Sequence, residues 1–180
     1  MSTFAAAVAR GKNGWTASEL ELSGLADIDE VVDRLRDAEP DADVCLLFVE
    51  ADDQYLVILR LDEGEDLRIF GSDSVYAEES RTGALLLGDI EAPAIDLDDL
   101  SSSDAADLES EDADEDEEDD QPTDPDADPV GDAEILADLG ISSHRLLALC
   151  ASEGMMPADI TAEIAQRLGC ADELEELREA

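Results

Sequence analysis

The feature that most constrains the fold is a run of 42 residues, from 89 to 130, without a single Lys, Arg, His or aromatic side chain. The same run carries 20 carboxylates. A segment with so many like charges and so few apolar side chains cannot bury enough surface to offset the entropy lost on ordering. We therefore predict a disordered acidic linker over residues 89–130, between a folded domain at 1–88 and a helical module at 131–180.

The charge of the whole chain favours one kind of partner and excludes others. The 180 residues include 51 acidic and 10 basic side chains, for a formal net charge of −41. Nucleic-acid affinity comes largely from Lys and Arg that neutralise phosphates. We therefore predict no direct binding to nucleic acid or to a membrane, and a protein partner with a basic surface. A general acidity of the proteome is an alternative for the folded segments, but it explains the acidic run less well.

The expected compartment is the cytoplasm. Residues 1–12 lack a basic region ahead of an apolar core, so no secretory signal is predicted. The longest strongly apolar run, 44–49, is far shorter than the roughly 18 residues of a membrane span. Three widely spaced cysteines, Cys45, Cys150 and Cys170, are typical of free thiols in a reducing compartment rather than of a disulfide framework.

The first part of the chain predicts a hairpin followed by one helix. Residues 3–9 and 15–22 read as two strands around a glycine-containing turn. Asp27, followed three residues later by Glu30, resembles a capping box, and apolar side chains recur at helical spacing until the chain reaches Pro40. These apolar side chains are Ile28, Val31, Val32 and Leu35.

Three further strands, at 44–50, 55–61 and 67–71, are predicted to form a meander. Residues 44–49 are all apolar, which is typical of a strand buried on both faces. A single helix can cover only one face. The other face would then be covered by residues 75–87, by the C-terminal helices, by a twin subunit or by a partner. Residues 72–88 leave helix and strand equally open.

After the acidic run, capping residues and glycines mark four helices, at 133–139, 143–151, 157–168 and 172–178. Fifty residues form a marginal core by themselves, so docking on the sheet or on a partner is expected. The predicted fold class is α+β, with a small, mostly antiparallel sheet, one packed helix, and an all-helical module after the linker.

The sequence predicts no catalytic, cofactor-binding or metal-binding residues. His144 is the only histidine, and no ligand set surrounds it at metal-binding spacing. Residues 111–120 are nearly all carboxylates but lack the glycine and closing glutamate of a calcium loop. The helices at 143–151 and 157–168 have helix-turn-helix spacing, yet the second carries Asp159 and Glu163 against one cation, so DNA reading is not expected. We therefore do not expect an enzyme, although carboxylate-only catalysis is a minor alternative.

Several blocks together resemble a known bacterial family. They are Trp15, the helix start at 27–32, the hairpin at 46–60, the acidic insert, and the blocks at 135–140 and 164–169. This combination resembles the tRNA adenosine deaminase-associated proteins over most of 1–72 and 131–178.

The resemblance implies a non-catalytic accessory protein linked to tRNA modification, with a tRNA adenosine deaminase as the basic partner. The chain itself does not read as the deaminase. Zinc deaminases need a His-x-Glu and a Pro-Cys-x-x-Cys, whereas His144 here is followed by Arg145 and Leu146, and no two cysteines are close. The alternative function is a nucleic-acid mimic or polyanionic interaction protein without a deaminase partner.

Overall fold

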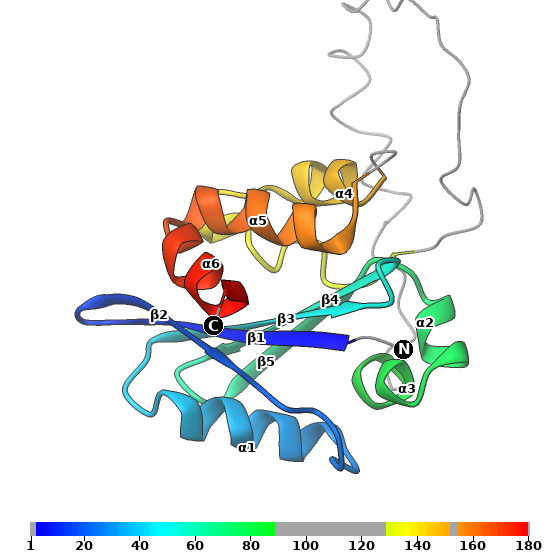
Figure 1. Ribbon diagram of the computed structural model, residues 1–180, viewed down its shortest axis with the longest axis horizontal. Coiled ribbons are helices and arrows are strands. Elements are labelled where there is room, and N and C mark those ends of the chain that lie inside the picture. Colours follow the sequence, from blue (N-terminus) through cyan, green and yellow to red (C-terminus); the bar gives the residue numbers. More distant parts are fainter. Residues whose placement is uncertain (1–2, 89–128, 152–154, 180) are drawn as a thin grey trace, which may run out of the picture.

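The protein forms three layers, with one antiparallel sheet between two sets of helices (Figure 1). The computed structural model describes residues 3–88, 129–151 and 155–179. The predicted disorder of residues 89–130 therefore falls almost entirely outside the described residues. The division of the chain at that run also stays a prediction.

The sheet has six strands in the order β2-β1-β3-β4-β5-β6, and every neighbouring pair is antiparallel. The predicted hairpin and meander are confirmed, and they form the first five strands. The sixth, a two-residue strand, was not predicted, and it includes Val130, which the prediction had assigned to the acidic linker. The strands are β1 (Thr3–Gly11), β2 (Gly14–Glu19), β3 (Val44–Ala51), β4 (Tyr55–Asp62), β5 (Asp66–Gly71) and β6 (Val130–Gly131).

The first helix, α1 (Ile28–Ala38), begins where the capping pattern predicts. The Asp27 carboxylate accepts a hydrogen bond of 3.1 Å from the Glu30 N–H. The Glu30 carboxylate in turn accepts one of 2.6 Å from the N–H of Ala26, the residue before the cap, so it also holds the chain that enters the helix. Val31 and Leu35 are fully buried against the sheet, as the helical spacing indicates.

Two short helices share this face of the sheet with α1, so the prediction of one packed helix was incomplete. They are α2 (Val75–Glu79) and α3 (Arg81–Leu87). Tyr76, Leu86 and Leu87 join Leu47 and Leu59 in the same core. The Ser80 hydroxyl caps α3 by accepting from two N–H groups, which resolves the open choice for residues 72–88 in favour of helix.

The C-terminal helices cover the opposite face and form a second core with it (Figure 1). They are α4 (Ser143–Ala151), α5 (Pro157–Leu168) and α6 (Ala171–Glu179). Leu46, Phe48 and Ile58 of the sheet are fully buried among Ile135 and Ile164. Of the four possible covers, the structure places the C-terminal helices on this face.

The prediction of an α-helix over residues 133–139 was wrong. Turns occupy 133–136, and a 3-10 helix, η3 (Ala137–Leu139), follows them. An α-helix would need the Ile135 C=O to accept from the Leu139 N–H. Instead the Leu139 N–H donates to the Leu136 C=O at 3.0 Å, and the Ile135 C=O accepts 2.8 Å from the guanidinium of Arg60. A side chain of the sheet thus takes the acceptor that the helix would use.

The two ends of the acidic run lie beside the same residue of β5, Gly71. A methyl group on Gly71 would lie 2.8 Å from Leu87, in the last turn of α3, and 3.3 Å from Val130, in β6. The backbone of Gly131 also approaches β5 closely, because a methyl group on Gly131 would lie 2.1 Å from the Ile69 carbonyl oxygen. Gly131 also has a φ of +91°, so glycine is required where the chain rejoins the sheet.

The buried central strand gives a first prediction. Leu47 is fully buried, and Leu47→Asp should unfold the protein, because an unpaired carboxylate there costs several kcal/mol against a stability of about 5 to 15 kcal/mol. The measurement is urea unfolding followed by circular dichroism. Met156→Asp is the control, because Met156 is 48% exposed and should accept a carboxylate with little change. A cooperative, wild-type-like transition for Leu47→Asp would contradict the prediction.

Candidate protein-interaction surface

One buried cation, Arg60 of β4, ties the sheet to the C-terminal segment. Its side chain lies on the same face as Leu56 and Ile58 and is 5% exposed. The guanidinium donates to both carboxylate oxygens of Asp138 at 2.5 and 2.7 Å, and to Asp62 at 3.0 Å. Together with the bond to the Ile135 C=O, these contacts satisfy a charge that would otherwise be costly to bury.

A second ion pair joins the layers at the far end of the chain. Arg178 of α6 pairs with Glu50, the second-last residue of β3. The Glu50 side chain is 9% exposed. The same guanidinium lies 4.9 Å from the centre of the Phe4 ring, which is a cation–π distance. A weaker contact of 4.0 Å links Arg68 of β5 to Asp132. All three contacts connect the sheet with residues that follow the acidic run.

The pKa shifts agree with this geometry. The hydrogen bond from Arg60 holds the pKa of the Asp138 carboxyl below its ordinary value, and the hydrogen bond to Asp138 raises the pKa of Arg60. Burial raises the pKa of the Cys150 thiol to about 12 and that of Cys170 to about 11. Burial also raises the pKa of Cys45, with a further contribution from Glu39. The three cysteines are free, and at neutral pH their thiols are poor nucleophiles.

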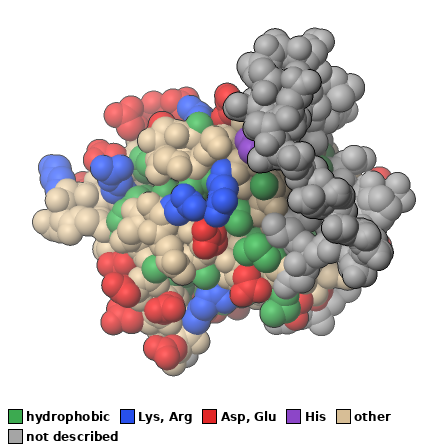
Figure 2. Space-filling model, turned by 90° about the horizontal axis from the view of Figure 1, so that it is seen from above, with side chains coloured by type: hydrophobic (Ala, Val, Ile, Leu, Met, Phe, Trp, Pro, Cys, Tyr) green, Lys and Arg blue, Asp and Glu red, His purple; other side chains and the backbone are tan. Residues whose placement is uncertain are grey.

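Most cations of the protein are paired with carboxylates of the same chain, and carboxylates remain in excess. Six of the ten Lys and Arg side chains are in ion pairs among the described residues. On the helical layer, Glu163 binds both Arg145, at 3.0 Å, and Arg167, at 3.4 Å. Figure 2, which views this layer from outside, shows basic side chains near the middle and acidic ones along the rim.

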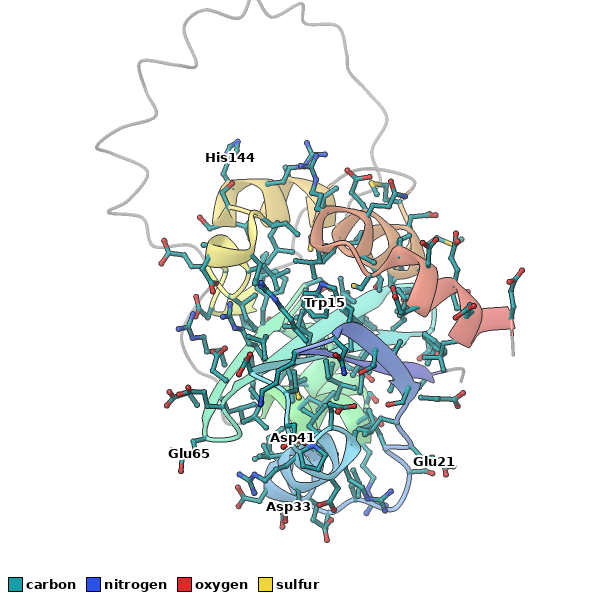
Figure 3. All side chains as sticks on the ribbon, turned by 90° about the vertical axis from the view of Figure 1, so that its left-hand side faces the viewer. Trp15, Glu21, Asp33, Asp41, Glu65 and His144 are labelled. Carbon is teal, nitrogen blue, oxygen red and sulfur yellow. The ribbon has the colours of Figure 1, made fainter. Side chains whose placement is uncertain are left out.

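The side of α1 carries a group of exposed carboxylates together with the cations Arg34 and Arg36. The exposed face of α1 carries four carboxylates, and the β4–β5 turn adds Glu63 and Glu65. Figure 3 shows Asp33 and Asp41 at this end of the molecule, opposite the helical layer that carries His144. A hollow of about 260 Å³ lies between α1 and the turn, and Arg36 crosses it to donate to the Gly64 C=O at 2.6 Å. The carboxylates of α1 are Asp29, Glu30, Asp33 and Asp37.

His144 and two methionines, Met155 and Met156, lie on the helical layer. His144 is exposed at the start of α4, where Figure 3 shows it pointing outward. Met155 is half-buried against the second core, whereas Met156 is the exposed large apolar side chain of the described residues. Within 3–88, 129–151 and 155–179, no group of three or more His, Cys, Asp or Glu side chains is placed to hold a metal ion. In the same ranges, no helix is both long and apolar enough to cross a membrane.

Comparison with known proteins identifies the family. The model of the Rv3753c-like tRNA adenosine deaminase-associated protein family matches residues 3–171. The chain belongs to this family. No curated protein and no solved structure matches it. The match spans the sheet and the helices α4 and α5 on its second face, so it includes both Arg60 and Asp138.

The sequence did not reveal which charged residues pair across the layers. The spacing puts Arg60 on the same face of its strand as Leu56 and Ile58, but nothing in it indicates that its partner lies 78 residues further along the chain. Glu50 and Arg178 are separated by 128 residues. The one available signal was a charged side chain in an otherwise apolar stripe, since such a residue requires a partner when the stripe is buried. In this deaminase-associated protein, these two ion pairs hold the C-terminal segment on the sheet, and each has one buried member.

The Arg60 cluster gives a second prediction. Asp138→Ala should lower the free energy of unfolding by about 2 kcal/mol, between the values for exposed and buried pairs, because Asp138 is 59% exposed and Arg60 is buried. Chemical denaturation measures it. Asp172→Ala is the control and should change stability little, because Asp172 is exposed on α6 and forms no ion pair within the described residues. Equal effects of the two substitutions would contradict a special role for Asp138.

The lowered pKa of Asp138 gives a prediction for acid solution. Because the unfolded chain binds this proton more tightly, the stabilisation is present above the ordinary aspartate pKa, near 4, and is lost as the pH falls through the lower pKa of the folded state. Stability measured from pH 6 down to about 2 should therefore fall less steeply in Asp138→Asn than in the wild type. Arg60→Met should remove the same part of the slope. A wild-type slope in both variants would show that this bond does not contribute.

Proposed function

We propose that the protein is a non-catalytic accessory protein that binds a tRNA adenosine deaminase through charge complementarity. Membership of the deaminase-associated family supports the choice of partner. The observation that carries the mode of binding is the engagement of the cations. Six of the ten Lys and Arg side chains, Arg60 among them, are already paired with carboxylates of the described fold, whereas the exposed Asp37, Glu63 and Glu65 pair with no cation there.

A deaminase that acts on tRNA is a suitable partner for such an exterior. An enzyme that binds RNA presents Lys and Arg to phosphates, and those side chains attract any polyanion of suitable shape. The described α1 side offers carboxylates on a folded surface, and residues 89–130 add 20 more from the sequence. Once the folded part is bound, the acidic run is held near the enzyme at a raised effective concentration. The accessory protein and tRNA would then compete for the same cations.

The non-catalytic part of the proposal is supported by the chemistry that the chain carries. The single histidine, His144, is followed two residues later by Leu146, where the His-x-Glu motif of a zinc deaminase has Glu. Cys45 contributes to one core, whereas Cys170 is buried in the other. The raised pKa values of the thiols also make cysteine-based nucleophilic catalysis at neutral pH unfavourable.

The proposal predicts a specific dependence on salt. Binding to the tRNA adenosine deaminase of the same cells should weaken by about tenfold between about 0.05 and 0.3 M salt, because the attraction is electrostatic. Added tRNA should compete. A variant in which the nine carboxylates of residues 111–120 are changed to Asn and Gln should show a flatter salt slope but keep residual affinity from the folded surface. Isothermal titration at the two salt concentrations measures both effects.

An unrelated basic protein, such as a lysozyme, is the control that separates the two functions. A pure polyanion would bind the control as tightly as it binds the deaminase, and it would lose affinity for both proteins to the same extent when residues 111–120 are neutralised. Equal affinities for the two proteins would therefore overturn the accessory function in favour of the polyanion. Absence of binding to either protein would overturn both.

A further inference from the structure

Strand β2 is an edge of the sheet whose outer backbone groups are unused among the described residues. The strand lies at the end of the order β2-β1-β3-β4-β5-β6, in the hairpin that projects from one side of the molecule (Figure 1). Antiparallel pairing uses the N–H and C=O of alternate residues, and the Leu20 N–H donates 2.9 Å to the Ala5 C=O. By this alternation, Thr16 and Ser18 bond to β1, whereas Trp15, Ala17 and Glu19 direct their backbone groups away from the sheet.

Strand β2 lacks two features that usually protect an edge strand, a proline and a β-bulge. Natural edge strands carry prolines, bulges or inward-pointing charges that prevent another strand from pairing. The register of β2 with β1 runs through six consecutive pairs without a bulge, and β2 contains no proline. At the opposite edge, part of β5 is already paired. Strand β6 pairs with the end of β5, and the Asp132 N–H donates to the Ile69 C=O at 2.9 Å.

We propose that the outer edge of β2 pairs with an extended segment of the deaminase that carries Lys or Arg, so that the partner adds a strand to the sheet. This inference rests on the proposed function and specifies how the partner is held. An added strand would bond to the N–H and C=O of Trp15, Ala17 and Glu19, six backbone groups in all. Main-chain bonds of this kind provide affinity, and the side chains that flank the edge select the partner.

The charges around the edge favour a basic strand. Helix α6 packs across β2 and β1, and it carries five carboxylates in nine residues. Glu19 is exposed on the same face of the strand as α6, and on the other face the Thr16 hydroxyl donates 3.4 Å to Glu39. The cations of the hairpin, Arg10 and Lys12, lie at its turn. Basic side chains of the partner are therefore expected at the Glu19 end of the strand.

A second copy of the chain is a less favourable occupant of this edge. Antiparallel pairing of β2 with β2 of another copy would set the turn of one hairpin against the Glu19 end of the other, which alone would be attractive. It would also bring two α6 helices towards each other, and each helix carries five carboxylates. Each whole chain has a net charge of −41. The like charges outweigh the contribution of Lys12, so we assign the edge to a basic partner.

Amide exchange of the full-length protein, followed residue by residue by NMR, tests the pairing without any substitution. In the free protein, the N–H groups of Trp15, Ala17 and Glu19 should exchange faster than those of Thr16 and Ser18, which donate to β1. In the complex with the deaminase, the three outer amides should slow by at least about tenfold, so that the alternation disappears. Unchanged exchange of these amides in a saturated complex would overturn the proposal.

A proline substitution tests the same edge through affinity. Ala17→Pro removes an outward N–H but no bond to β1, which is the setting in which edge strands tolerate proline. We expect the affinity for the deaminase to fall by about tenfold or more. Ala17→Ser, which keeps the N–H, is the matched control and should bind like the wild type. If Ala17→Pro does not fold, the exchange measurement decides.

The outcomes separate this inference from the proposed function. If the wild type binds the deaminase and Ala17→Pro binds equally well, the edge proposal is wrong and the accessory function stands. If the wild type does not bind the deaminase, the accessory function fails and this inference fails with it. If sedimentation shows that the protein alone dimerises and that Ala17→Pro abolishes the dimer, the edge belongs to a second copy, and the proposal is overturned.

Discussion

The structure depends on a sheet that is apolar on both faces. In β3, Leu47 and Val49 point into the core under α1, and Leu46 and Phe48 point into the core under the C-terminal helices. Because such a strand cannot leave either face in water, the chain must supply two covers. One cover comes from residues before the acidic run, and the other comes from residues after it. The helices before the acidic run and the helices after it therefore pack on the same central strands.

Arg60 determines how the second cover sits on the sheet. An apolar side chain at that position would also fill the core, and replacing a buried ion pair by apolar groups is often neutral for stability. An apolar residue would not, however, distinguish one placement of residues 132–140 from another. The guanidinium requires acceptors in fixed directions, and it finds them in Asp62, Asp138 and the Ile135 C=O. The 3-10 turn at η3 is thus a local consequence of a long-range contact.

Local patterns in the sequence predicted most of the elements and few of the contacts between them. The cap at Asp27, the all-apolar stretch of β3 and the glycine after α5 depend on neighbouring residues, and all three are present in the structure. The error at 133–139 has a different origin, since the competing hydrogen bond comes from a strand more than 70 residues earlier. The openness of β2 also needed the strand order, because a six-residue strand reads the same at the centre of a sheet and at its edge.

The position of Gly71 changes the meaning of the acidic run. Leu87 and Val130 both lie against this one residue, so the run leaves the folded body and returns to it at nearly the same point. It has no distance to bridge, and it joins two parts that already share a core. In that arrangement the run is an insertion rather than a spacer. For a flexible insertion, doubling the length costs only about 0.6 kcal/mol in closure entropy. The number of carboxylates in such a loop can therefore vary widely among related chains while the three-layer body stays the same.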